Sequence, residues 1–434
     1  MSSNEESSQI NETSLLDTLR VLTSVVAPTV AKGVIKRRPS VEALAQHHGL
    51  DTKALQLLQD LRRKYGSDPL QLNVLLRSQV LILDPKHVAQ VLSLTPIPFG
   101  SASKEKRSAL RHFEPSNILI ADPEQRSQLR PIHEHALATN SRIHPFASRF
   151  SHIIPSELSP LFSSETLDWT AFSTAWSKIT LRIALGDSAR DDNDLIDDLD
   201  YIRQKANWGF MAFTDKSRLE SYQAKVNKYI SKREEGSLVS RLPGGNVDLA
   251  SQVAQWLFAF DAAAMATFRA LALLGAHPQE QERVFGEARG SGEEKPFTRG
   301  VLLESLRLWP TTPAILREAT EDAEIGGRKV EKGTGVAIFA PFFHRDNETL
   351  GFADKLAPEQ WADKEAILEK GLVPFSAGPA MCPAHNLVPM VASLVMCGLV
   401  KERKIELVHP QLDVEALPGT LNNFEVKLRL SMRG

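Results

Sequence analysis

Residues 374–387 read PFSAGPAMCPAHNL and lead into an apolar segment that continues to Val400. The thiol of Cys382 lies at the expected start of a helix, with Pro383 at the first helical position. Free main-chain N–H groups and the helix dipole favour a thiolate at such a place. The stretch therefore predicts a cysteine that can bind a metal, although a single cysteine is more often a buried apolar residue without a ligand.

The spacing within this stretch points to a particular kind of site. Phe375 is followed by Gly378 three residues later and by Cys382 four residues after that. This pattern resembles the haem-binding loop of the cytochrome P450 superfamily, whose members hold haem iron through the cysteine. The resemblance implies that Cys382 is the axial ligand of haem b (iron protoporphyrin IX) and that Phe375 and Gly378 shape the loop around the cofactor.

Two positions of the loop depart from the family pattern. A basic residue that contacts a haem propionate usually stands two before the cysteine, where this chain has Ala380, and a glycine usually stands two after it, where this chain has Ala384. Neither change removes the ligand, but the first requires other cations for the propionates. The resemblance assigns that role to Arg126, Arg130 and Arg317. By themselves, Arg126 and Arg130 would be read as solvated surface charges one helical turn apart.

The segment 253–276 is apolar almost all the way round, as expected of a buried helix. Two charged residues interrupt it, which argues against a transmembrane span. In the family, the long central helix carries small residues, an acid and a threonine beside the oxygen-binding face of the haem. Counting back from His277 places Ala259 and Asp261 at the small-residue and acid positions and Ala262 at the threonine position.

The alanine at position 262 is the most informative departure from the family. Oxygen activation needs protons, and an acid with a neighbouring hydroxyl forms the usual relay. Thr267 does not obviously replace that hydroxyl, because six residues at 100° each place it well away from the Asp261 face. Either a water or a substrate hydroxyl completes the relay, or the reaction does not need it. We take Asp261 as the proton-relay candidate and expect Ala259, Phe260 and Ala262 to face the distal pocket.

A third motif lies between these two. Glu304 and Arg307 can pair on one face of a helix, and together with the prolines that follow they resemble the structural Glu-x-x-Arg pair of the family. The implied role is in folding. Gln360 stands where the family usually has an arginine, so the customary third partner of Glu304 is missing or is supplied by another residue.

Composition restricts the general class of the protein. A chain of 434 residues with a formal net charge of −2 gives no reason to invoke nucleic acid. We expect a disordered tail over residues 1–13 and a single catalytic domain over 14–434. Two cysteines exclude a disulfide scaffold and favour a reducing cytoplasm. The apolar run 21–31 is too short to span a membrane. A helix packed on the domain is preferred there to a helix on a membrane surface.

The expected fold is therefore mainly α with small β-sheets, the cytochrome P450 fold, with haem between the long central helix and the helix of the cysteine loop. The resemblance implies a monooxygenase that inserts one oxygen atom from O2 into an apolar small organic substrate, such as a fatty acid, terpenoid, steroid or aromatic compound. No Gly-rich nucleotide loop is present. Electrons are therefore expected from a separate ferredoxin or flavodoxin-type donor, delivered to a monomer without a transmembrane anchor.

Several assignments stay open. Lys106, Arg107 and Arg111 either contribute to a docking face for the electron donor or are solvated charges. The cluster of Trp208, Phe210, Met211 and Phe213 is either core or part of the roof over the substrate.

The reaction itself also has alternatives. Ala262 motivates a haem-thiolate enzyme outside ordinary monooxygenation, such as a peroxide-driven hydroxylase, a dehydratase or an isomerase. Against the peroxide version, fatty-acid peroxygenases of the family carry Arg-Pro on the central helix, whereas this chain has Ala262-Ala263. A haem-binding protein without catalysis is less favoured because Asp261 is present. The substrate is not identified by the sequence.

Overall fold

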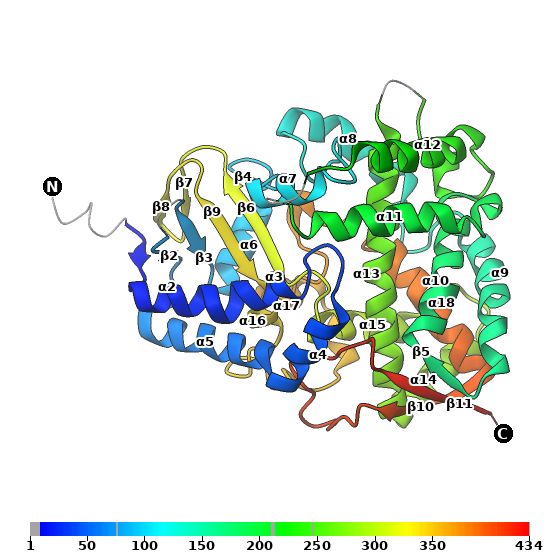
Figure 1. Ribbon diagram of the computed structural model, residues 1–434. Coiled ribbons are helices and arrows are strands. Elements are labelled where there is room, and N and C mark those ends of the chain that lie inside the picture. The colour runs from blue at the N-terminus through cyan, green and yellow to red at the C-terminus, as the bar shows by residue number, and fades with distance from the viewer. Residues whose placement is uncertain (1–8, 75–76, 210–212, 245–246, 434) are drawn as a thin grey trace.

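The computed structural model describes residues 9–74, 77–209, 213–244 and 247–433. Within these ranges a large helical part lies beside a smaller part built on a β-sheet (Figure 1). Helices dominate and the strands are short. The predicted fold class, mainly α with small β-sheets, is therefore confirmed.

The helices and strands have the following bounds. The helices are α2 (Leu15–Val21), α3 (Ala27–Ala31), α4 (Pro39–His48), α5 (Leu50–Tyr65), α6 (Pro85–Ser93), α7 (Lys104–Leu110), α8 (Pro123–Ala136), α9 (Ala147–Leu158), α10 (Trp169–Ala184), α11 (Asn193–Ala206), α12 (Lys216–Lys232), α13 (Leu249–Ala276), α14 (Pro278–Arg289), α15 (Pro296–Leu308), α16 (Ala340–His344), α17 (Lys364–Glu369) and α18 (Leu387–Glu402). The strands are β1 (Asn11–Glu12), β2 (Leu70–Leu72), β3 (Gln79–Leu81), β4 (Phe99–Gly100), β5 (Thr166–Asp168), β6 (Ala314–Ala319), β7 (Ala323–Ile325), β8 (Arg328–Val330), β9 (Gly335–Phe339), β10 (Arg403–His409) and β11 (Lys427–Met432).

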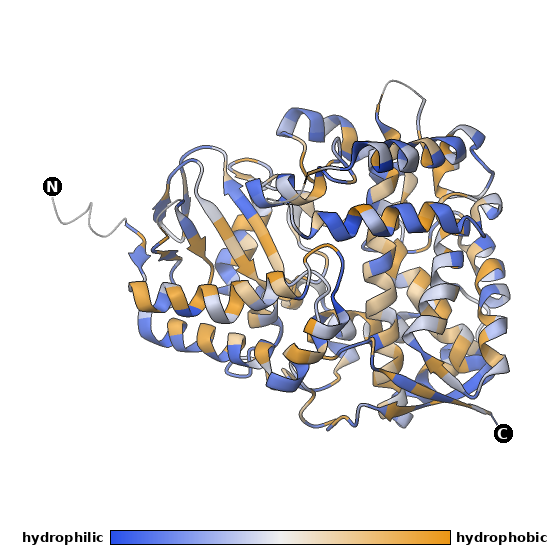
Figure 2. Ribbon diagram, viewed as in Figure 1, coloured by the Kyte–Doolittle hydropathy of each residue, from blue (hydrophilic) through white to orange (hydrophobic). Residues whose placement is uncertain are grey.

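Helix α13 runs through the middle of the helical part (Figure 1). Asp248 caps its N-terminus by accepting a hydrogen bond from the main-chain N–H of Ser251. Helices α10, α12, α15 and α18 pack around it, which explains why hydrophobic residues occupy most of its circumference (Figure 2). Among the described helices, α13 alone has the length and composition of a membrane span, but 78% of its most apolar window is buried inside the protein. The prediction of a buried helix is confirmed.

The main sheet places one candidate site residue in the interior. Its six strands have the order β1-β2-β3-β9-β6-β4. Strand β6 pairs antiparallel with β9 and alternates between half-buried and buried residues. Because side chains of a strand point alternately to opposite faces, Arg317 lies on the same buried face as Ile315 and Ala319. The strand period thus directs a guanidinium group into the protein.

The N-terminal segment agrees only in part with the expectations. Residues Asn11–Glu12 form β1, which pairs in parallel with β2, so the prediction of disorder over residues 1–13 is wrong at that end. Residues 1–8 lie outside the described part. Helices α2 and α3 and the π-helical turn between them form one continuous helix, which packs on α5 as predicted and buries Val21 and Val25. Its other side exposes an apolar stripe, namely Leu15, Leu16, Leu19, Leu22, Val26 and Val30.

The two described residues of the aromatic cluster near residue 210 are not part of the core. Trp208 is half exposed beneath the guanidinium of Arg38, and the side chain of Phe213 is 96% exposed. The interpretation of these two residues as core is therefore wrong. Phe210 and Met211 lie outside the described residues.

Candidate functional site

The loop before α18 has a specific backbone conformation around Cys382. The N–H of Cys382 donates to the carbonyl of Phe375 at 2.9 Å, which closes the loop into a tight turn. Gly378 has a φ of +66°, and a Cβ at this position would collide with the main-chain carbonyl of Leu92 at the end of α6. Both observations require glycine at residue 378. Phe375 and Gly378 thus form the loop with Cys382, as the spacing predicts.

The expectation that a helix start stabilises a thiolate at Cys382 is wrong. Helix α18 begins at Leu387, five residues beyond the cysteine, and Pro383 lies in a turn before it. Burial raises the pKa of the Cys382 thiol, while a hydrogen bond from the N–H of Ala384 and the positive charge of Arg130 act in the opposite direction. The protein alone therefore favours the neutral thiol, and a bound metal cation would be needed to hold the thiolate.

One face of α13 keeps accessible surface although the helix is surrounded by others. Gln255, Phe258, Ala259 and Ala262 are half buried, whereas most residues between and beyond them are fully buried. Their spacing of three or four residues places them along one stripe of the helix. We call this the α13 stripe. Ala259 and Ala262 therefore lie together on one face, as expected of a face that lines a bound group.

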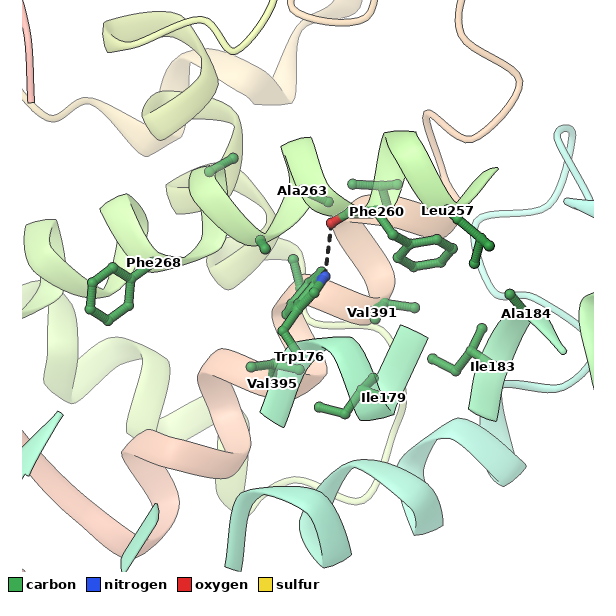
Figure 3. Close-up of a cluster of buried hydrophobic side chains, with 14 of the residues drawn as sticks. Trp176, Ile179, Ile183, Ala184, Leu257, Phe260, Ala263, Phe268, Val391 and Val395 are labelled. Carbon is green, nitrogen blue, oxygen red and sulfur yellow. Dashed lines mark hydrogen bonds between the residues drawn. The ribbon is translucent and has the colours of Figure 1, made fainter. Parts of the chain in front are cut away.

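Phe260 does not belong to this stripe, and the expectation that it faces the distal pocket is wrong. The residue is 3% exposed and lies in the core cluster between α13, α10 and α18 (Figure 3). Its carbonyl accepts a hydrogen bond from Nε1 of Trp176 at 2.8 Å (Figure 3). A separation of two residues corresponds to 200° around a helix, which puts Phe260 nearly opposite Ala262.

Asp261 borders the α13 stripe and is paired. Its Oδ2 lies 2.5 Å from Nη2 of Arg203 on α11, and its side chain keeps 40% of its surface exposed. The guanidinium of Arg203 also lies over the ring of Phe258, 5.1 Å from the ring centre. Thr267 is fully buried, and its hydroxyl donates to the carbonyl of Ala263 at 2.7 Å, so it does not serve Asp261. Asp261 is thus paired with the cation of Arg203. Residue 262 is an alanine and supplies no hydroxyl beside it.

Three cations lie close together without a carboxylate partner among the described residues. Arg126, Arg317 and the ammonium group of Lys106 donate only to carbonyl or hydroxyl oxygens, those of Ile118, Thr95, Leu316, Ser376 and Ser101. Burial lowers the pKa of Arg126 and of Arg317 to about 10, with repulsion from Arg130 adding to the effect on Arg126 and repulsion from Arg126 adding to the effect on Arg317. Burial, together with repulsion from Arg317 and Arg126, lowers the pKa of Lys106 well below its ordinary value.

Buried positive charge of this kind is costly unless an anion compensates it. The cluster therefore fits the two propionate carboxylates of a haem. Arg126 and Arg317 belong to it, whereas Arg130 is already engaged by Glu134 at 2.7 Å and by the carbonyl of Met381 at 2.7 Å. Arg130 thus holds the chain next to Cys382.

Lys106 is the site residue that the sequence reasoning missed. Its assignment to a docking face or to a solvated surface run is wrong, because its ammonium group lies in the cation cluster. Arg107 and Arg111, its neighbours in the same run, are exposed. A run of cations gives no sign of which member turns inward. Only its place within the long segment 93–121, in which the short helix α7 carries Lys106, could have raised suspicion.

The Glu304–Arg307 pair is fully buried and bidentate, with N–O distances of 2.7 and 2.8 Å. Arg307 also donates to several main-chain carbonyls of the segment 344–355. Trp361 supplies the third partner, because its Nε1 donates to Oε1 of Glu304 at 2.9 Å. Gln360 does not take part in this network and accepts instead from Lys370.

Comparison with known proteins gives a consistent result. Residues 216–421 match the family model described as "Cytochrome P450". The chain is 32% identical over 148 residues to the cyclooctat-9-en-7-ol 5-monooxygenase of Streptomyces melanosporofaciens, covering 31% of this chain and 32% of the relative. It is 29% identical over 204 residues to cytochrome P450 4c3 of Drosophila melanogaster, covering 43% and 37%. It is also 31% identical over 176 residues to the sugiol synthase of Salvia miltiorrhiza, covering 37% and 35%. The chain thus spans about a third of the length of the curated relatives that it matches.

Proposed function

We propose that this chain, whose residues 216–421 match the cytochrome P450 family, is a member of that superfamily and a haem-thiolate monooxygenase, which inserts one oxygen atom from O2 into a small organic substrate. The observation that carries the proposal is the combination of Cys382 in its loop, the accessible α13 stripe and the cation cluster without anions. Each of the three fits a different part of a haem: the iron, the distal face and the propionates.

The residues divide the work as follows. Cys382 would hold the iron, and Arg126, Arg317 and Lys106 would balance the propionates. The haem would be the non-covalent b form, since Cys397, the other cysteine, is buried beside Thr298 and both cysteines are free. When bound, the haem supplies the activation of O2.

Proton delivery falls to Asp261. Its carboxylate is held by Arg203 at the border of the α13 stripe, where it can exchange a proton with a water. Ala262 contributes no hydroxyl, so we propose that a water or a hydroxyl of the substrate completes the relay. The methyl groups of Ala259 and Ala262 keep this face of the helix apolar.

The α13 stripe indicates the class of substrate, and the family resemblance indicates the class of electron donor. The α13 stripe presents Phe258, Ala259 and Ala262, which suits an apolar substrate of the fatty acid, terpenoid, steroid or aromatic classes. One relative is named for monooxygenation of cyclooctat-9-en-7-ol, and we propose a largely hydrocarbon substrate of comparable kind. Electrons would come from a ferredoxin or flavodoxin-type protein.

We also propose that residues 14–434 act as one catalytic domain in a monomer of the cytoplasm without a transmembrane anchor. Two free cysteines support a reducing compartment. The exposed apolar stripe from Leu15 to Val30 makes a membrane surface the alternative. Fractionation of the full chain decides between them. Recovery in the soluble fraction supports the proposal, and recovery with membranes that only detergent releases contradicts it.

The decisive experiment tests the ligand. Reduced protein exposed to carbon monoxide should show the absorption signature of a thiolate-bound haem, and Cys382→Ala should abolish it. Cys397→Ala is the matched control and should retain the signature, because Cys397 is buried away from the loop. A signature that survives Cys382→Ala would refute the proposal.

A second candidate is favoured by one observation, the alanine at position 262. It is a haem-thiolate enzyme outside ordinary monooxygenation: a peroxide-driven hydroxylase, a dehydratase or an isomerase. Turnover of one substrate should be compared with a reduced electron donor plus O2 and with hydrogen peroxide alone. Product formed only with peroxide, or with neither oxidant, would favour the second candidate.

A further inference from the structure

Hydrogen-bonding side chains from three helices and one loop meet beside the N-terminal part of the α13 stripe. We propose that Glu114, Arg203, Tyr222 and Gln255, which we call the polar cluster, bind a neutral oxygen group of the substrate, a hydroxyl or a carbonyl. The inference rests on the proposed function, because it places the polar end of the substrate in the same site.

Tyr222 gives the clearest sign of a missing partner. The residue lies on α12 and is fully buried, and its hydroxyl has no hydrogen-bond partner among the described residues. Glu114 and Arg203 both influence the pKa of its hydroxyl, which places the three groups near one another. A buried hydroxyl without a partner loses its hydration uncompensated, and such groups are rare in native proteins. A ligand that supplies the partner explains why the hydroxyl is kept.

Glu114 adds a second group. It is fully buried in the loop after α7, and its two carboxyl oxygens lie 2.8 and 2.9 Å from the amide nitrogen of Gln255 once that amide is oriented to donate. Burial raises the pKa of Glu114 well above its ordinary value. The raised pKa favours the neutral acid, which accepts from Gln255 and keeps one O–H to donate elsewhere.

Arg203 adds a third group and determines the charge. Its Nε is buried and has no hydrogen-bond partner in the described part of the chain, while its Nη2 is paired with Asp261 and its Nη1 lies 3.7 Å from Asp200. These carboxylates compensate the charge of the guanidinium. The polar cluster thus offers N–H and O–H donors without an uncompensated cation. Such donors suit a neutral oxygen acceptor on the substrate. A substrate carboxylate would lose its hydration here and would find no unpaired cation to compensate its charge.

The position of the polar cluster limits the size of the substrate. Gln255 is the first member of the α13 stripe, and Ala262 lies seven residues further along the same face. Seven residues correspond to about 10 Å along a helix. A substrate whose oxygen rests on the polar cluster therefore extends its apolar body over Phe258 and Ala259. A carbon of that body, roughly 10 Å from the oxygen, then lies beside Ala262.

The test compares probes that differ only in their oxygen group. The ferric haem-loaded protein is titrated with dodecane, 1-dodecanol and dodecanoate and with cyclododecane, cyclododecanol and cyclododecanone, and binding is read from the change in the haem absorption spectrum. We expect an alcohol or ketone to bind at least about tenfold more tightly than its parent hydrocarbon and than dodecanoate. Equal affinities for hydrocarbon and alcohol, or no binding of any alcohol or ketone, would overturn the inference.

Variants of Tyr222 separate binding from folding. Tyr222→Phe should remove most of the preference for the oxygenated probe and leave hydrocarbon affinity unchanged. Because the hydroxyl has no partner in the free protein, the melting temperature should stay the same or rise. Tyr229→Phe is the matched control on the same helix. Its hydroxyl donates to Asp192 at 2.7 Å, so this change should lower the melting temperature and keep the preference. A Tyr222→Phe protein that loses stability and retains the preference contradicts the inference.

Variants of Glu114 test its neutral state. Glu114→Gln keeps a neutral donor and should retain the preference, whereas Glu114→Leu should lose it. Every preparation is first checked for the carbon monoxide signature. A protein without that signature refutes the proposed function, while one that has the signature but shows no preference refutes only the polar cluster.

Discussion

The Glu304–Arg307 pair receives its third partner from Trp361, one position after the residue that usually provides it in the family. Both side chains are fully buried, so every lone pair of the carboxylate needs a donor. Trp361 provides one through its indole N–H, and the main-chain N–H of Ala357 provides another at 2.7 Å. The indole stands one position after the residue where the family usually carries an arginine. A neutral donor is sufficient because Arg307 already balances the charge.

This arrangement makes a prediction for Trp361. Trp361→Phe removes the N–H and leaves one carboxylate oxygen of Glu304 short of a donor, which should cost about 1–3 kcal/mol of unfolding free energy. Urea denaturation measures the change. Gln360→Ala is the control and should cost less than about 0.5 kcal/mol, since Gln360 makes only a long contact with Lys370. Equal losses in the two variants would show that Glu304 does not depend on the indole.

A second residue-scale prediction concerns the missing hydroxyl. If water relays protons past Ala262, Ala262→Thr should leave the ratio of product formed to electrons consumed equal or higher, because it adds the usual hydroxyl next to Asp261. Thr267→Ala is the control, and it should not change this ratio because the Thr267 hydroxyl bonds within its own helix. Loss of product with unchanged haem binding would mean instead that the alanine makes room for the substrate.

At the scale of elements, the cysteine loop depends on its contact with α6. The end of α6 presents the carbonyl of Leu92 directly against Gly378, so the two segments approach backbone to backbone. The main sheet acts in a similar way on the other side of the site, because the alternation of β6 turns Arg317 inward towards Thr95 and Ser376. The position of the loop therefore results from two elements that are remote from it in the sequence.

The close approach at Gly378 can be tested by adding one methyl group. Gly378→Ala needs a left-handed backbone and a Cβ where the Leu92 carbonyl lies, so the loop should shift and the haem content per chain should fall severalfold. The ratio of haem absorbance to protein absorbance reports the content. Gly351→Ala has free space around its Cβ and should keep full haem content. Full haem content in Gly378→Ala would show that the loop tolerates the displacement.

At the scale of the whole molecule, buried neutral histidines make folding sensitive to acid. Burial lowers the pKa of His133 to about 4, and the charges of Arg130 and Arg126 act in the same direction. Burial likewise lowers the pKa of His144 to about 4. His133 accepts from the indole N–H of Trp256 at 2.9 Å, so its ring must stay neutral to keep this bond.

The sign of the pH effect follows from these pKa values. The folded pKa lies below the ordinary value of 6.5, so the folded protein binds fewer protons than the unfolded chain. The free energy of unfolding therefore has its full value above pH 6.5. It decreases as the pH falls from 6.5 to about 4, by about 3 kcal/mol for each histidine. Urea midpoints between pH 7.5 and 4.5 measure the loss.

His133→Gln should reduce this slope by up to about one proton. His135→Gln, which changes an exposed histidine on the same helix, should leave the slope unchanged. An unaltered slope in His133→Gln would assign the acid sensitivity to other groups.

Much of the fold and part of the site could be predicted because the relevant signals are local. The spacing of Phe375, Gly378 and Cys382 describes one loop, and the apolar content of residues 253–276 describes one buried helix. Helical geometry alone also placed Thr267 well away from the Asp261 face. In each case the atoms that matter lie within a few turns of the same segment, so the sequence period reports their geometry.

By itself, the sequence determined the mainly α fold, the buried central helix and the candidate ligand Cys382. Only the tertiary structure decided that Lys106 turns inward, that Phe260 turns away from the α13 stripe, and that Trp361 replaces the third partner of Glu304. These outcomes depend on which segments pack together over long sequence distances. Burial by remote elements, and not the local pattern, determines which polar groups lose water and must find a partner.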